Sequence, residues 1–122
     1  GAIFGEEMDR IIERAKVVLV PSEWYENGAF VALQALAKGK IVVASDIAGL
    51  SEIVQDGETG YLCAPTDADA FAEKIKLLSD REVRSSMQKA CVEKAEEFRL
   101  EISHQQMTDI YKNLLDGQEK SK

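Results

Sequence analysis

Residues 17–46 read VVLVPSEWYENGAFVALQALAKGKIVVASD, and the architecture follows from this stretch. Two short apolar, β-branched runs, residues 17–20 and 41–44, end at Pro21-Ser22 and Ser45-Asp46, which predicts two strands buried on both faces. Between them residues 28–37 are almost wholly apolar, and Gly39 stands where the end of a helix favours a left-handed backbone. A strand, a packed helix and a strand in this order predict a βαβ unit with a parallel sheet.

Further elements are expected on both sides of this unit. Residues 6–14 repeat apolar side chains at helical spacing and carry acids at their start, which predicts a short amphipathic helix. Residues 60–63 follow a turn-rich segment and stop before Pro65, which predicts a third strand.

The second half of the chain predicts helices. Thr66, with Asp69 three residues later, is the expected N-cap of a helix that ends near Asp80. Two separate helices are expected after it, over residues 83–98 and residues 107–114. The sequence thus predicts an α/β fold with a partial parallel sheet of three to four strands, flanked by helices, and a helical C-terminal third. Residues 1–115 form the expected domain, and residues 116–122 a polar, disordered tail.

Composition restricts the partners. The 122 residues have a net charge of -7, and no stretch gathers Lys and Arg with aromatic residues, so nucleic acid and anionic membranes are not expected partners. No apolar run approaches the length of a bilayer span. Cys63 and Cys91 lie in apolar patterns without a CxxC motif, which favours two reduced core thiols and a cytoplasmic protein.

A ligand is expected where the parallel strands end, because loops diverge and helix N-termini point inward at that edge. Residues 22–28 follow the first strand and residues 45–50 follow the second. The first loop leads into a helix that opens with Gly28 and Ala29, whose small side chains leave backbone N–H groups accessible to an anion. Glu26 is either a carboxylate that favours the positive end of this helix or a ligand-binding group, and the residues alone leave both open.

Gln34 is the one polar side chain on this apolar helix. It follows Glu26 by eight residues, or about 12 Å along a helix axis. It is either a core amide satisfied by the backbone or a hydrogen-bonding group for the far end of an extended ligand.

Several blocks carry a family resemblance: PSEWYEN at residues 21–27, LQALAKGKIVVASDIAGLSEIV at 33–54 and DGETGYL at 56–62. In this order they resemble the donor-binding half of the retaining glycosyltransferases of GT-B fold often called the group 1 family, and the match runs from a strand end at residues 3–5 to the last helix. The resemblance implies a Rossmann-like domain, a nucleotide-diphosphate sugar as donor substrate and no metal or other cofactor. It implies that Glu26 is the catalytic residue that contacts the transferred sugar. The donor-binding candidates are Ser22, Asn27, Gly28, Ala29, Phe30, Gln34, Ser45 and Asp46.

The sequence departs from that family's pattern in three respects. The family's second glutamate is replaced by Gln34, which lacks the charge that strengthens bonds to ribose hydroxyls. Its usual Gly-Phe-Gly is Asn27-Gly28-Ala29 here. The family's phosphate-binding Arg and Lys, and its acceptor domain, precede residue 1, and residues 17–60 hold only Lys38 and Lys40 as cations. We therefore expect that the isolated chain is not a competent transferase and that it needs the missing half.

The sequence also bears on self-association and on an alternative function. The strand at residues 17–20 lacks its usual neighbour, so an open apolar edge predicts a homodimer or docking on the missing half; a monodisperse monomer by light scattering would contradict self-association. The alternative function is a non-catalytic, degenerate module that serves as a partner or scaffold subunit. The chain contains no GxSxG, GxxxxGK[ST] or GxGxxG motif, and the lone His104 has no partners at metal-ligand spacing.

Overall fold

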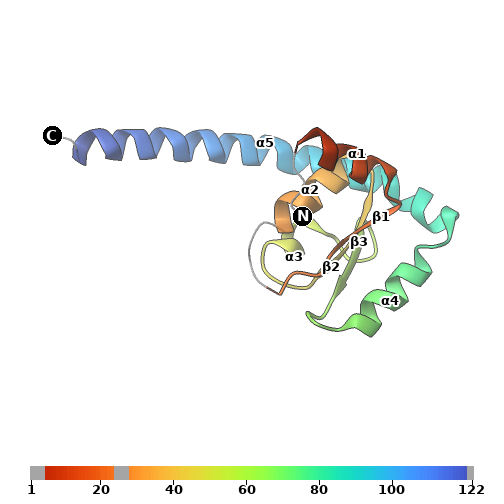
Figure 1. The fold of residues 1–122 in the computed structure, drawn as a ribbon. Coiled ribbons are helices and arrows are strands. Elements are labelled where there is room, and N and C mark those ends of the chain that lie inside the picture. The colour runs from red at the N-terminus through yellow and green to blue at the C-terminus, as the bar shows by residue number, and fades with distance from the viewer. Residues whose placement is uncertain (1–4, 24–27, 121–122) are drawn as a thin grey trace.

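A parallel sheet of three strands organises the chain (Figure 1). The computed structural model describes residues 5–23 and 28–120, and for residues 28, 99–106 and 117–120 the backbone alone. Strands β1 (Val17–Val20), β2 (Ile41–Ser45) and β3 (Gly60–Cys63) lie in the order β1-β2-β3, with Val17 opposite Ile41 and Val42 opposite Gly60. The predicted βαβ unit and the third strand are confirmed. The strand end expected at residues 3–5 falls largely outside the described residues.

The two strands of the βαβ unit differ in burial. All five residues of β2 are buried, as the sequence predicts. In β1 only Val20 is buried, and Leu19 is 45% exposed, so the prediction that this strand is buried on both faces is wrong. The reason is position, because β1 pairs with β2 alone among the described strands and forms an edge of the sheet.

Helix α1 (Glu6–Arg14) precedes β1, and helix α2 (Gly28–Ala37) connects β1 to β2. Ile12 anchors α1 in the core, and Lys38 Nζ, just after α2, lies 3.0 Å from Glu13 Oε1. The hydrogen bond with Glu13 raises the pKa of Lys38. Gly39 has φ 72°, which confirms the predicted left-handed end of α2.

One side of α2 is buried and the other is open. Ala32, Ala35 and Leu36 are fully buried, whereas Phe30 is 55% exposed and Gln34 is exposed. The expectation of a helix packed on nearly every side is therefore wrong. The helix is apolar around most of its circumference, but the described residues cover only one side of it.

Helices α3 (Leu50–Ile53) and α4 (Ala68–Leu77) follow β2 and β3. The N-cap of α4 is Asp67, whose Oδ1 accepts a hydrogen bond from Ala70 N at 3.0 Å, and not Thr66 as predicted. Thr66 instead adopts a left-handed backbone with φ 67°, which turns the chain before the cap.

A single helix, α5 (Arg81–Lys120), replaces the two C-terminal helices that were predicted and continues into the expected tail. No Gly or Pro stands between residues 81 and 116 to interrupt it. Met87, Cys91 and Ala95 pack into the core, and the helix then projects away from the domain (Figure 1). Its outer part exposes the apolar residues Met107, Ile110, Tyr111, Leu114 and Leu115. In the parts of the chain that the structure describes, no helix combines the length and apolar character needed to cross a bilayer.

The two cysteines are buried free thiols, as expected. Cys91 Sγ donates to the carbonyl oxygen of Thr59 at 3.4 Å, and Thr59 Oγ1 accepts from Gln55 N at 2.8 Å. These bonds satisfy a fully buried threonine and connect α5 to the turn before β3.

Candidate functional site

The carboxyl ends of the three strands meet at one edge of the sheet because the strands are parallel. Residues 21–23 follow β1, residues 46–49 follow β2 and residues 64–67 follow β3. The structure thus brings together the two loops that the sequence selected and adds a third.

Ser45 is the last residue of β2 and is fully buried. Its Oγ has no hydrogen-bond partner among the described residues, although buried hydroxyls are normally satisfied. The next residue, Asp46, donates its backbone N–H to the carbonyl oxygen of Cys63 at 2.7 Å, while its side chain is exposed. Within the described part of the chain, the end of β2 therefore presents a hydroxyl without a partner and an exposed carboxylate.

The N-terminus of α2 lies after the loop that leaves β1. Gly28 is its first residue, and no acidic residue lies in the described first turn of the helix. Ala29 is half-buried and Phe30 is exposed. Glu26 and Asn27, both predicted site residues, lie outside the described residues.

Gln34 lies in the second turn of α2 with its side chain exposed. This exposure argues against a core amide satisfied by the backbone, one of the two interpretations of the sequence. Ser22, in the loop after β1, is half-buried, and Glu23 beside it is exposed.

The loop after β3 was missed by the sequence reasoning. It contains Thr66, the one non-glycine residue with a positive φ in the described ranges. Such backbone conformations cost free energy and concentrate at functional sites. The Ala64-Pro65-Thr66 run directly after a predicted strand was the available signal.

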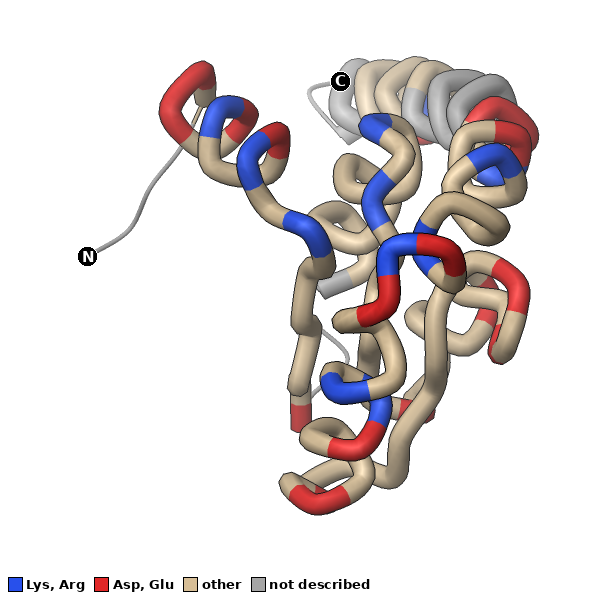
Figure 2. Tube along the Cα trace, turned by 90° about the vertical axis from the view of Figure 1, so that its right-hand side faces the viewer, with Lys and Arg blue, Asp and Glu red and all other residues tan. Residues whose placement is uncertain are grey.

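The described part of this edge is acidic. Glu23, Asp46 and Asp67 lie in the three loops, and none of the described loop residues is Lys or Arg. Figure 2 shows acidic residues at the lower end of the molecule, and basic residues together with acidic ones in its upper half. Among the described residues no three His, Cys, Asp or Glu side chains form a cluster suited to a metal ion. This edge can therefore bind an anion through backbone N–H groups. It can bind sugar hydroxyls through a serine hydroxyl, an amide and the Asp46 carboxylate.

Known proteins are similar to this chain in sequence and in fold. The chain is 36% identical over 107 residues to the D-inositol 3-phosphate glycosyltransferase of Corynebacterium aurimucosum, covering 87% of this chain and 25% of that protein. It is 39% identical over 87 residues to the lipopolysaccharide 1,2-N-acetylglucosaminetransferase of Salmonella typhimurium, covering 70% of this chain and 23% of that protein. The solved structure of a sucrose-phosphate synthase from Thermosynechococcus elongatus superposes with a TM-score of 0.72 at 34% identity, over 88% of this chain and 27% of the other.

The chain thus spans about a quarter of the length of these relatives. The sequence model of the family described as "Glycosyl transferases group 1" matches residues 1–98. By this match over most of its length, the chain belongs to the group 1 glycosyltransferase family.

Proposed function

We propose that this chain is the donor-binding portion of a nucleotide-sugar-dependent glycosyltransferase that transfers a hexosyl group with retention in polysaccharide or glycoconjugate synthesis. One observation carries the proposal: in a chain of this family, α2 starts after β1, and the Ser45 hydroxyl, which has no partner among the described residues, lies at the carboxyl end of the neighbouring parallel strand β2. Helix N-termini bind phosphate, and an unsatisfied buried hydroxyl needs a hydrogen-bonding partner.

Each candidate residue has a role in this proposal. Glu26 contacts hydroxyls of the transferred sugar, and the backbone N–H groups of Gly28, Ala29 and Phe30 face the diphosphate. Gln34, exposed in the second turn of α2, accepts a hydrogen bond from the ribose. The polar groups of Ser22, Asn27, Ser45 and Asp46 complete the donor site. No metal is invoked, because positive groups can stabilise the leaving diphosphate.

The described loops of the site lack those positive groups. In this proposal the positive groups and the acceptor site are supplied by a part of the protein outside this chain. The chain itself spans about a quarter of the length of its relatives. Catalysis therefore requires that part, and we place the complete enzyme in the cytoplasm.

Gln34→Glu tests the site. A carboxylate accepts stronger hydrogen bonds from ribose hydroxyls than an amide does, so the variant is expected to bind a nucleotide sugar about fivefold more tightly. Calorimetric titration with UDP-glucose, GDP-mannose and ADP-glucose measures the change. Gln55→Glu is the matched control, since its exposed side chain lies after α3, away from the loops that follow the strands.

The alternative is a non-catalytic module that keeps the fold and serves as a partner or scaffold subunit. Gln34 in place of a carboxylate and the acidic edge favour it. Equal affinities of the wild type, Gln34→Glu and Gln55→Glu, or no binding by any of them, would support the scaffold and contradict the donor site.

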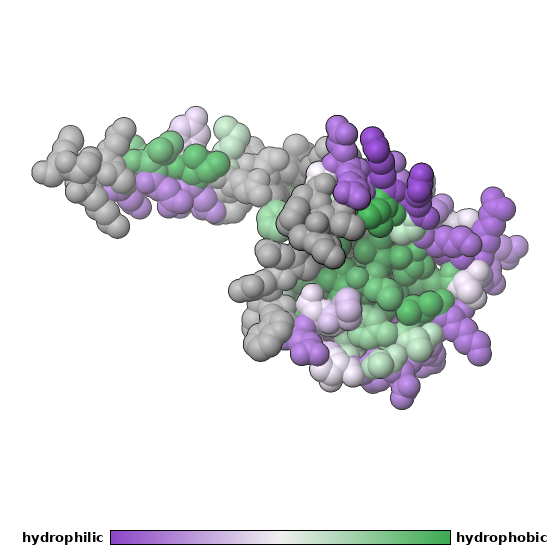
Figure 3. Space-filling view, viewed as in Figure 1, coloured by the Kyte–Doolittle hydropathy of each residue, from purple (hydrophilic) through white to green (hydrophobic). Residues whose placement is uncertain are grey.

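The edge of the sheet supports a second part of the proposal, that β1 is covered by the rest of the protein or by a second copy. Leu19 of β1 is exposed, and Figure 3 shows apolar surface over the sheet between α1 and α4. An apolar edge strand favours pairing. Light scattering on this chain distinguishes a dimer from a monomer, and a monodisperse monomer would contradict the dimer.

A further inference from the structure

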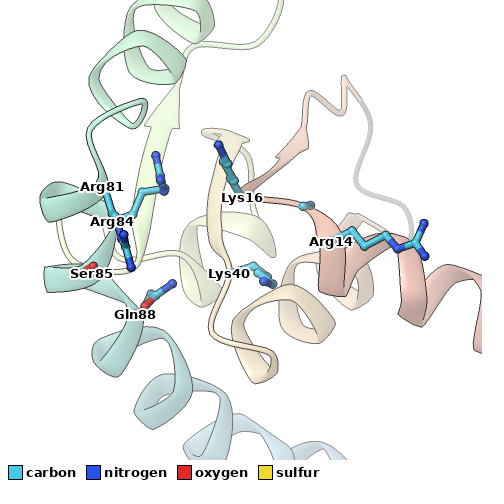
Figure 4. Close-up of a pocket in the computed structure, with 8 residues that line it drawn as sticks. Arg14, Lys16, Lys40, Arg81, Arg84, Ser85 and Gln88 are labelled. Carbon is cyan, nitrogen blue, oxygen red and sulfur yellow. The ribbon is translucent and has the colours of Figure 1, made fainter.

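A pocket of about 290 Å³ lies at the amino ends of β1 and β2, the end opposite to the candidate donor site (Figure 4). Three segments that are distant in the sequence line it: the residues before β1, the residue before β2 and the first two turns of α5. The polar and charged residues that line the pocket are Arg14, Lys16, Lys40, Arg81, Arg84, Ser85 and Gln88.

Five of these side chains are cationic, in a chain whose net charge is -7. Among the described residues, none of the five has a carboxylate oxygen within 4.0 Å of its nitrogens. Neighbouring cations differ: on α1 Arg10 pairs with Glu6, and Lys38 pairs with Asp9 and Glu13. Gathering like charges without counter-charges opposes folding, so this cluster favours a bound anion.

Arg84 is held in place at the pocket. Its Nη1 donates to the carbonyl oxygens of Leu78 at 2.7 Å and Ser79 at 2.9 Å, at the end of α4. A guanidinium has five N–H donors, so Nε and Nη2 keep theirs for a ligand. Figure 4 shows Arg84, Lys16 and Lys40 on different sides of the pocket, with Ser85 and Gln88 beside them, while the Arg14 guanidinium extends outward.

Carboxylates flank two of these cations in the sequence: Glu13 precedes Arg14 and pairs with Lys38, and Asp80 and Glu82 lie on either side of Arg81. Asp80 Oδ1 accepts a hydrogen bond from Glu82 N at 2.8 Å and so caps the helix, and Glu82 is exposed. The pocket therefore depends on its side chains and not on the end of this helix.

We propose that this pocket binds a phosphate-bearing anion. Guanidinium, ammonium, hydroxyl and amide donors around one cavity are the groups that bind phosphate oxygens. The volume lies at the lower limit of small-molecule pockets, about 300 Å³, so it suits a phosphate or diphosphate group with a small substituent. The ligand is either a soluble phosphate compound or the phosphate of a lipid headgroup.

The test is a titration of this ¹⁵N-labelled chain with sodium pyrophosphate at low salt, followed by amide chemical shifts. Expected is saturable binding with shifts at residues 15–16, 40 and 84–88, weakened by added NaCl. Lys40→Gln is expected to weaken it about tenfold, the loss of one charge-assisted hydrogen bond. Lys16→Gln is also expected to weaken pyrophosphate binding, and it leaves the hydrogen bonds of Arg84 intact. Lys76→Gln, an exposed lysine of α4 with the same charge change, is expected to leave the affinity within twofold.

A second arm distinguishes the two sources of phosphate. Sedimentation with phosphatidylglycerol vesicles that depends on Lys40 supports a lipid headgroup, and pyrophosphate binding without vesicle binding supports a soluble ligand. The proposal is overturned if neither probe binds, if Lys76→Gln weakens binding as much as Lys40→Gln, or if the shifts are confined to residues 28–30. That last result would instead place the anion at the candidate donor site.

Discussion

The Ser45 hydroxyl and the Gln34 amide show what single residues can and cannot reveal. Position alone selected Ser45, because it follows an apolar run in a chain that predicts a parallel sheet. Its complete burial without a partner depends on the strands on either side and could not be predicted. For Gln34 the sequence allowed a buried amide, but the side chain is exposed. The reason is that the other described elements cover only one side of α2.

Cys91 predicts a pH dependence. Burial raises the pKa of its thiol from 9.0 to about 11. The folded chain therefore keeps the thiol proton to a higher pH than the unfolded chain, so this contribution is fully present below pH 9 and is lost as the pH rises toward 11. The free energy of unfolding is expected to fall by about 2 kcal/mol over that range because of Cys91.

Urea unfolding of the wild type and Cys91→Ala between pH 8 and pH 10.5 measures this term. The variant is less stable at pH 8, since it leaves a cavity, but its stability should decline less with pH. Cys63 is present in both proteins and cancels in the difference. Parallel pH profiles would show that Cys91 does not titrate in this way.

At the scale of elements, the pairing of β2 with β3 requires a glycine at position 60. A Cβ at Gly60 would lie 1.8 Å from the carbonyl oxygen of Val42, in the backbone of the central strand. Gly60→Ala is therefore expected to separate the strands and to cost about 3 kcal/mol of unfolding free energy.

Gly57→Ala is the matched control. Its φ of 82° strains an alanine, yet a Cβ there meets no atom within 4 Å, so about 1 kcal/mol is expected. Denaturant unfolding of both variants gives the comparison. Equal losses would mean that the approach of Val42 to Gly60 does not limit the sheet.

The elements were predictable where the pattern and the packing agree. The βαβ unit followed from two β-branched runs around an apolar helix, and all three elements are present. α5 was divided in two because its apolar positions cluster at residues 83–98 and 107–114. Apolar periodicity indicates which side of a helix packs against other elements. Whether the helix continues between two such segments depends on the absence of Gly and Pro.

At the scale of the whole molecule, charge is separated along the strands. The net charge of -7 describes neither end: the described loops at the carboxyl edge are acidic, and five cations line a pocket at the opposite end. The sequence showed that Lys38 and Lys40 are the only cations of residues 17–60. The sequence could not predict that one pocket is lined by Lys16, Lys40 and the start of α5, because only the tertiary structure brings them together.

The central claim is that the edge beyond the strands binds a nucleotide sugar through Glu26. The most direct test is saturation-transfer NMR on this chain against UDP-glucose, GDP-mannose and ADP-glucose, with Glu26→Ala and with Glu23→Ala as the matched control on the same loop. The claim predicts saturable binding of at least one sugar nucleotide, weakened about tenfold or more by Glu26→Ala and little by Glu23→Ala. Binding that is unaffected by Glu26→Ala, or no binding of any of the three, would contradict it.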